Sequence, residues 1–112
     1  MIRFLVAVRA ALEGVVYGLK TQRHLRFHLL AAVLAVTAGI WRGLTPGGWG
    51  LLILLIAAVI AAELLNTAIE AVVDLVSPDY HPLAKAAKDT AAGAVLILAI
   101  AALLVAVVLF IV

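Results

Sequence analysis

The stretch LLILLIAAVIAAELLNTAIEAVVDLV, residues 51–76, decides the fold. It is long and apolar enough for a helix that crosses a bilayer, whose hydrocarbon core is ~30 Å thick. Its second half carries polar side chains that fall within roughly 100° of one helix face. This acidic stripe consists of Glu63, Asn66, Thr67, Glu70, Asp74 and Ser77.

A carboxylate inside lipid is costly, at ~2.5–3.5 kcal/mol on insertion scales, so such groups are kept only with a partner or a task. One explanation of the acidic stripe is a hydrogen-bonded ladder that joins helices. The other, which we favour, is a buried acidic site that binds a metal, a proton or a polar substrate.

The composition is that of a small integral membrane protein. Of the 112 residues, 68% are hydrophobic, and the mean hydropathy is +1.31. The chain has no cysteine, which excludes disulfide, thiolate and cysteine–zinc chemistry. The net charge is only +2, and the chain has no stripe of basic residues interleaved with aromatic ones. We therefore expect no nucleic-acid partner.

Hydropathy predicts an all-α integral membrane protein with a single membrane domain. Residues 1–20 form an amphipathic pattern that suits a helix lying in the membrane interface. Three transmembrane helices are predicted at residues 28–44, 49–76 and 83–112. Turn residues separate them, around Pro46 and Gly47 and again around Pro78 and Pro82.

The basic residues predict the orientation in the membrane. Arg42 alone lies on one side of the predicted spans. The other seven lie on the opposite side: Arg3, Arg9, Lys20, Arg23, Arg26, Lys85 and Lys88. The positive-inside rule therefore places the N-terminus in the cytoplasm of a cell whose inner, or plasma, membrane holds the protein. All six acidic residues lie in that same half, which predicts a cytoplasmic working end.

A second polar group begins the last predicted helix. Lys85 and Asp89 are spaced i,i+4, so a plain surface ion pair accounts for them equally well. Lys88 points elsewhere and can neutralise either phosphate oxygens or Glu70. Carboxylates that hold a divalent cation beside a lysine are typical of phosphoryl transfer. A deeper carboxylate can then take the proton from a lipid hydroxyl.

Common nucleotide-binding motifs are absent: the chain has neither a Walker A pattern nor a protein-kinase signature. His24 and His28 are spaced i,i+4 and can bind a metal, although a pair at the headgroup level is the commoner arrangement. Spacing alone leaves the reaction open.

Two strings of residues resemble a known family. ELLNTAIEAVVD at residues 63–74 and AKDTAAGAV at residues 87–95 look like the signature of the prokaryotic diacylglycerol kinase and undecaprenol kinase family. Residues 21–28 and 79–83 extend the resemblance, which covers essentially the whole chain. It implies a homotrimer of three-span subunits with a surface helix, and active sites at the subunit interfaces.

The resemblance also implies an activity, a cofactor and a set of site residues. Family members use ATP with Mg²⁺ to phosphorylate a membrane lipid alcohol. Glu63 corresponds to the base that activates the lipid hydroxyl, and Glu70 and Gln22 to the metal ligands, with Asn66 and Asp74 supporting them. Glu63 and Ala92 are the expected lipid contacts. The expected ATP contacts are Arg3, Gln22, Glu70, Asp79, Tyr80, His81, Lys88 and Asp89.

The chain departs from the family pattern at two positions. Diacylglycerol-type members carry glutamate where this chain has Gln22, so either Mg²⁺ binds more weakly or another acid such as Glu13 compensates. Ala10 replaces an aromatic residue that some members place near the nucleotide. The string HPLAKAAKDTAAGAV, residues 81–95, is closer to undecaprenol kinases and favours a polyprenol acceptor over diacylglycerol.

Two other classes of function are compatible with the composition. A small proton- or ion-coupled transporter can use Glu63, Glu70 and Asp74 as a relay, but no acid lies in residues 41–62 to continue it. A purely structural subunit leaves the cluster of Lys88 and three acids without a purpose. An enzyme accounts for both observations.

Overall fold

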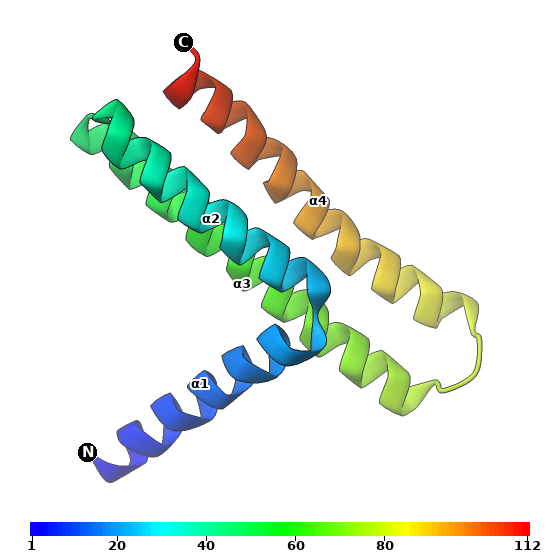
Figure 1. Ribbon diagram of the computed structural model, residues 1–112. Coiled ribbons are helices and arrows are strands. Elements are labelled where there is room, and N and C mark those ends of the chain that lie inside the picture. Colours follow the sequence, from blue (N-terminus) through cyan, green and yellow to red (C-terminus); the bar gives the residue numbers. More distant parts are fainter.

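The computed structural model describes all 112 residues as four helices joined by short connections (Figure 1). They are α1 (Ile2–Thr21), α2 (Arg23–Arg42), α3 (Pro46–Val76) and α4 (Pro82–Phe110). The predicted all-α fold is confirmed. Helices α2, α3 and α4 are long and apolar enough to cross a membrane, whereas the less apolar α1 is not among these candidates.

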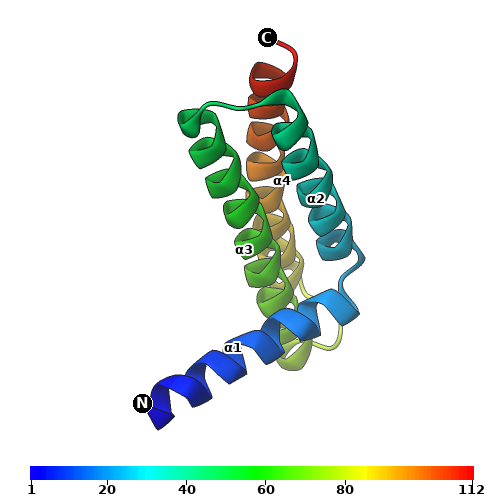
Figure 2. The same ribbon diagram turned by 60° about the vertical axis from the view of Figure 1, so that its left-hand side comes forward.

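The three apolar helices form a bundle, and α1 crosses one end of it (Figure 2). Both views place the α3–α4 connection at the end where α1 lies (Figures 1 and 2). The α2–α3 turn and the C-terminus lie at the opposite end. The molecule therefore has one end where α1 and the α3–α4 connection, which are far apart in the sequence, lie together.

The helices extend beyond the predicted spans at their N-terminal ends. Helix α2 begins at Arg23 rather than at residue 28, because the chain is helical on both sides of a single extended residue, Gln22. Helices α3 and α4 each begin at a proline, Pro46 and Pro82, instead of residues 49 and 83. Proline suits the first helical position, since it lacks the N–H that has no partner there.

The α1–α2 junction is held by the side chains that surround Gln22. The Arg26 guanidinium donates to the carbonyl oxygens of Leu19 and Lys20, at 3.0 and 3.2 Å, and so caps the last turn of α1. Gly18 is buried where α1 crosses α3. A Cβ at this position would lie 2.8 Å from the Leu64 Cδ2 atom and 2.9 Å from that of Leu25. A side chain at this position would therefore require the Leu64 and Leu25 side chains to move.

The other two connections carry recognisable helix caps. Gly43 ends α2 in the left-handed region, with φ of 74°, which glycine adopts without steric cost. The Thr45 hydroxyl accepts from the Gly48 N–H at 3.1 Å and caps α3. The Nδ1 atom of His81 accepts from the Leu83 N–H at 3.0 Å and caps α4.

The length of α3 carries its acidic stripe to the end of the bundle near α1. Its 31 residues span roughly 46 Å at 1.5 Å per residue, well over the ~30 Å hydrocarbon core. Only 8 of the 112 residues are buried, and the buried hydrophobic ones are Leu25, Leu52, Val59 and Val95. Most of the apolar surface thus faces outward, as lipid contact requires.

Replacing Gly18 with valine tests the crossing of α1 over the bundle. Overpacking of this kind typically costs about 1–3 kcal/mol, so Gly18→Val should lower the midpoint of thermal unfolding in detergent by several degrees. The matched control is Gly14→Val, because a Cβ at Gly14 meets nothing within 4 Å. Equal unfolding temperatures for the two variants would show that α1 does not dock through Gly18.

Candidate active site

The acidic stripe begins with a carboxylate buried inside the bundle. Glu63 is only 5% exposed and Thr67, one turn further along α3, only 4%. The Thr67 hydroxyl donates to the backbone carbonyl oxygen of Glu63 at 2.8 Å. This bond satisfies the hydroxyl within its own helix and leaves the Glu63 carboxylate for other partners.

The partner of that carboxylate comes from the neighbouring helix. The Nε2 atom of His28 on α2 lies 3.3 Å from the Oε1 atom of Glu63. His28 thus joins α2 to α3 at this carboxylate. No group of three or more histidine, cysteine or carboxylate side chains that could hold a metal is found in the structure.

Glu70 lies two turns beyond Glu63 and has an amide on each side. The Nε2 atom of Gln22 lies 3.5 Å from one carboxylate oxygen, and the Nδ2 atom of Asn66 lies 3.5 Å from the other. Both distances are at the long limit of hydrogen bonding. The Oδ1 atom of Asn66 is buried with no hydrogen-bond partner. Gln22, Asn66 and Glu70 thus form a cluster of oxygen and amide groups with unused capacity.

This cluster fits a hard divalent cation. Mg²⁺ is usually held by one or two carboxylates together with water and substrate phosphates, so a single Glu70 suffices on the protein side. Rotating either amide by 180° turns an oxygen toward Glu70 in place of the nitrogen. The unpartnered Oδ1 atom of Asn66 is the acceptor that such a cation would satisfy.

A polar cavity lies at the α3–α4 connection. Its volume is about 380 Å³, within the usual range for small-molecule sites. The lining brings together residues from both helices and the loop: Asp74, Ser77, Asp79, Tyr80, His81, Lys85, Lys88 and Asp89. The lining contains three carboxylates and two lysines and so carries no excess of positive charge. An anionic ligand here therefore needs an accompanying cation.

Both lysines of this polar cavity are paired in the structure. The Nζ atom of Lys88 lies 2.5 Å from Asp74, which joins α4 to α3, and that of Lys85 lies 2.5 Å from Asp89. The expected i,i+4 pair is thus present. All four side chains are 40–65% exposed, and such pairs contribute little to stability. A phosphate can therefore compete for either lysine at small cost.

A second cavity lies deeper in the bundle and is almost wholly apolar. It also measures about 380 Å³ and is lined by α2, α3 and α4. Fourteen of its 15 lining residues are hydrophobic, and the remaining one is His28. Val59 and Ile60 in its wall lie one turn of α3 before Glu63. The one polar residue of the apolar cavity is thus the histidine that contacts Glu63.

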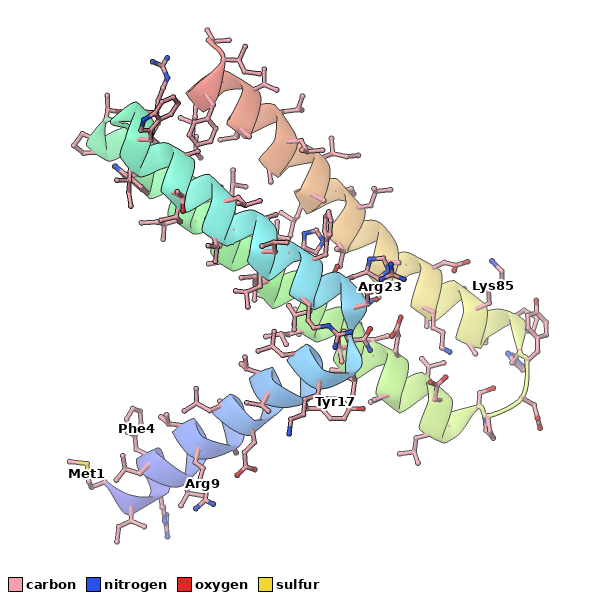
Figure 3. The ribbon with its side chains drawn as sticks, in the orientation of Figure 1. Met1, Phe4, Arg9, Tyr17, Arg23 and Lys85 are labelled. Carbon is pink, nitrogen blue, oxygen red and sulfur yellow. The ribbon has the colours of Figure 1, made fainter.

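Some predicted site residues lie apart from this group within one subunit. Arg3 is exposed near the free end of α1, where the neighbouring Phe4 is drawn far from the bundle (Figure 3). Glu13 pairs with Arg9 at 3.3 Å and lies roughly 13 Å along the helix axis from Gln22. Ala92 is exposed on α4 and lines neither cavity, and Ala10 is exposed on α1.

The contact between His28 and Glu63 is the feature that sequence reasoning missed. The sequence did carry a signal, because His28 is a polar residue inside a predicted span. Its depth relative to Glu63 depends on how α2 packs on α3, which no spacing within one helix reveals.

Comparison with known proteins assigns the family. Residues 9–110 match the family described as prokaryotic diacylglycerol kinase. The chain belongs to this family. The match takes in α2, α3 and α4 and most of α1.

Individual relatives carry lipid kinase names. The chain is 40% identical to the undecaprenol kinase of Bacillus subtilis over 96% of its own length and 88% of that protein. It is 49% identical to a diacylglycerol kinase of Synechocystis over 90% of its length, but spans only 58% of that relative. A diacylglycerol kinase of Escherichia coli is 41% identical over 67% of the chain and 62% of that protein. Family membership favours an enzyme, a lipid kinase, over a transporter or a structural subunit.

The cluster around Glu70 predicts how metal binding responds to charge. Glu70→Ala removes the only carboxylate of the cluster and should sharply weaken the binding of Mn²⁺, used as a spectroscopic substitute for Mg²⁺. Gln22→Glu adds a second carboxylate and should tighten it. Electron paramagnetic resonance of free Mn²⁺ in a titration measures both, with Glu13→Gln as the control. Identical titrations for all the proteins would exclude the cluster as a metal site.

Proposed function

We propose that the protein is an ATP- and Mg²⁺-dependent kinase that phosphorylates the hydroxyl group of a polyprenol, undecaprenol being the favoured acceptor. The observation that carries this proposal is the position of Glu63 on α3. This buried carboxylate lies one turn of α3 beyond the wall of an apolar cavity, and it begins the acidic stripe that leads to a polar cavity. A hydroxyl on a hydrocarbon chain and an anionic nucleotide can approach it from opposite sides.

The chemistry is a single phosphoryl transfer. The lipid hydroxyl oxygen forms a bond to the γ-phosphorus of ATP as the bond from that phosphorus to its bridging oxygen breaks, and ADP leaves. The Glu63 carboxylate takes the hydroxyl proton as general base. Mg²⁺, when bound, would supply positive charge against the phosphates. Glu70, with Gln22 and Asn66, would hold this cation roughly 10 Å along α3 from Glu63.

The polar cavity supplies suitable groups for the rest of the nucleotide. Lys88 exchanges its surface pair with Asp74 for a phosphate oxygen. Tyr80 is 79% exposed, so its ring is free to stack on a base. The Nδ1 atom of His81 caps α4 and leaves its Nε2 atom for the ligand. Asp79 and Asp89 complete the lining as acceptors for nucleotide hydroxyl and amino groups.

Two observations support a polyprenol rather than diacylglycerol as acceptor. A relative of which the chain covers 88% is named undecaprenol kinase. The apolar cavity offers no polar lining residue except His28, which suits an acceptor whose only polar group is its terminal hydroxyl. Diacylglycerol, named for the relatives from Synechocystis and Escherichia coli, is the second candidate.

The proposed assembly is a homotrimer in an inner, or plasma, membrane with the N-terminus and the site on the cytoplasmic side. The excess of lysine and arginine at this end of the bundle supports the orientation. A subunit by itself leaves the N-terminal end of α1, which carries Arg3, away from the bundle (Figure 2). A neighbouring subunit's α1 can bring the corresponding arginine to the site.

A kinase assay in mixed micelles tests the proposed function. Purified protein receives ATP labelled at the γ-phosphate together with undecaprenol or diacylglycerol, with and without Mg²⁺. We expect labelled undecaprenyl phosphate as the main product and none without the metal. The matched control is Glu63→Gln, which should lose about 10²–10⁴-fold in kcat through removal of a general base. Transfer to diacylglycerol alone would overturn the acceptor, and no transfer to either would overturn the function.

Mixing two inactive variants tests whether subunits share the site. One variant is Glu63→Gln, and the other is Arg3→Ala in α1, because Gln22 contacts Glu70 of its own subunit. If an α1 from one subunit completes the site of another, some interfaces of a mixed trimer combine two intact halves and activity returns in part.

Co-purification through two different affinity tags establishes that the mixed assemblies form. Each variant taken through the same mixing procedure alone is the control for activity that the procedure itself restores. Mixed assemblies that stay inactive would show that each subunit holds a complete site.

A further inference from the structure

The contact between His28 and Glu63 joins two helices at the proposed catalytic base. The Nε2 atom of His28 lies 3.3 Å from the Oε1 atom of Glu63, and the two side chains are 21% and 6% exposed. We propose that His28 is a positioning residue that holds the Glu63 carboxylate through this contact and leaves Oε2 to receive the lipid hydroxyl. The inference rests on the proposed function, because it assigns His28 to the same base.

The Glu63 carboxylate has no other protein partner that would fix its orientation. The nearby Thr67 hydroxyl donates to the backbone carbonyl of Glu63, not to its carboxylate. Two other polar side chains, Asn66 on the acidic stripe and Gln22 between α1 and α2, contact Glu70 instead. A glutamate with three side-chain torsions and no partner would populate several rotamers. The 3.3 Å contact with the His28 Nε2 atom favours the rotamer in which Oε1 faces α2.

The orientation of a base has a large effect on its rate. A displacement of about 1 Å from the reactive geometry costs on the order of 10²-fold. A contact held at one carboxylate oxygen restricts the direction of the other. An imidazole with a proton on Nε2 can donate at this oxygen.

The place of His28 in the apolar cavity connects this contact to the acceptor. His28 is the one polar residue among the 15 that line the cavity. An acceptor chain that lies in the cavity therefore presents its hydroxyl where the imidazole meets the carboxylate. His28 marks the polar end of the apolar wall, beside the Glu63 carboxylate.

A simpler role for His28 is a structural tie between α2 and α3. That role predicts a loss of thermal stability, and effects on rate that do not depend on Glu63. Positioning predicts an effect on kcat that acts only through Glu63. The two roles therefore differ in how the variants combine.

The experiment compares three single variants, His28→Leu, His28→Gln and Glu63→Gln, in the mixed-micelle assay. A double variant combines His28→Leu with Glu63→Gln. His28→Leu should lower kcat by about 10–100-fold and change the KM for ATP by less than about twofold. His28→Gln keeps an N–H donor and should recover part of that loss. His24→Leu is the matched control, since His24 is exposed on the same helix, and should match the unaltered protein.

The double variant decides between the roles. If His28 acts through Glu63, adding His28→Leu to Glu63→Gln should lower kcat no further than Glu63→Gln alone. Losses that multiply, or an unaltered kcat in His28→Leu, would overturn the positioning role while the proposed function stands. An unaltered kcat in Glu63→Gln would instead overturn the base itself, and the positioning role with it.

A direct measurement covers the case in which His28→Leu does not fold. The chain has only three histidines, so ¹⁵N-labelled imidazoles give a simple nuclear magnetic resonance spectrum in detergent. The Nε2 signal of His28 should shift in Glu63→Gln, while the signals of His24 and His81 stay in place. An unchanged His28 signal would show that the contact does not exist.

Discussion

The burial of one carboxylate in an apolar helix is the constraint on which the rest of the structure depends. Glu63 is 5% exposed on α3, where an unpaired carboxylate costs ~2.5–3.5 kcal/mol on insertion scales. In the structure, the His28 imidazole from α2 lies beside the Glu63 carboxylate and provides it with a polar partner. It also places Glu63 near the end of the hydrocarbon-spanning segment, where α3 leaves the apolar part of the bundle. Without that partner and that depth, the helix would carry an uncompensated charge into lipid.

The lengths of α3 and α4 divide the molecule into two chemical environments. Both helices exceed the thickness of a hydrocarbon core, so one end of each extends beyond it. The apolar cavity lies within the spanning part, and the polar cavity lies where the two helices join. Glu63 and Glu70 stand between them on one face of α3. A lipid kinase requires this arrangement, because its two substrates come from different phases.

A single subunit forms a complete bundle, but Arg3, one of the expected site residues, lies apart from the others. Gln22, Asn66 and Glu70 come together because α1 ends beside α3, where Gly18 allows close approach. The free N-terminal end of α1, where Arg3 lies in the sequence, points away from the bundle (Figure 2). Exposed apolar side chains on α1 face outward as well. The proposed trimer would cover part of this surface and add an arginine to the site, which is why the assembly and the mechanism are proposed together.

The sequence by itself determined the class of the fold and the chemistry of the acidic stripe. Runs of apolar residues define three spans, because lipid requires each backbone group to be satisfied within its own helix. The spacing of Glu63, Glu70 and Asp74 places them on one face for the same local reason. The tertiary structure alone decided which residues from other helices meet that face. His28 opposite Glu63, Gln22 beside Glu70 and Lys88 against Asp74 depend on how helices rotate and slide against one another. That packing is set by side-chain shape at crossings such as Gly18, which no periodicity within a single helix encodes.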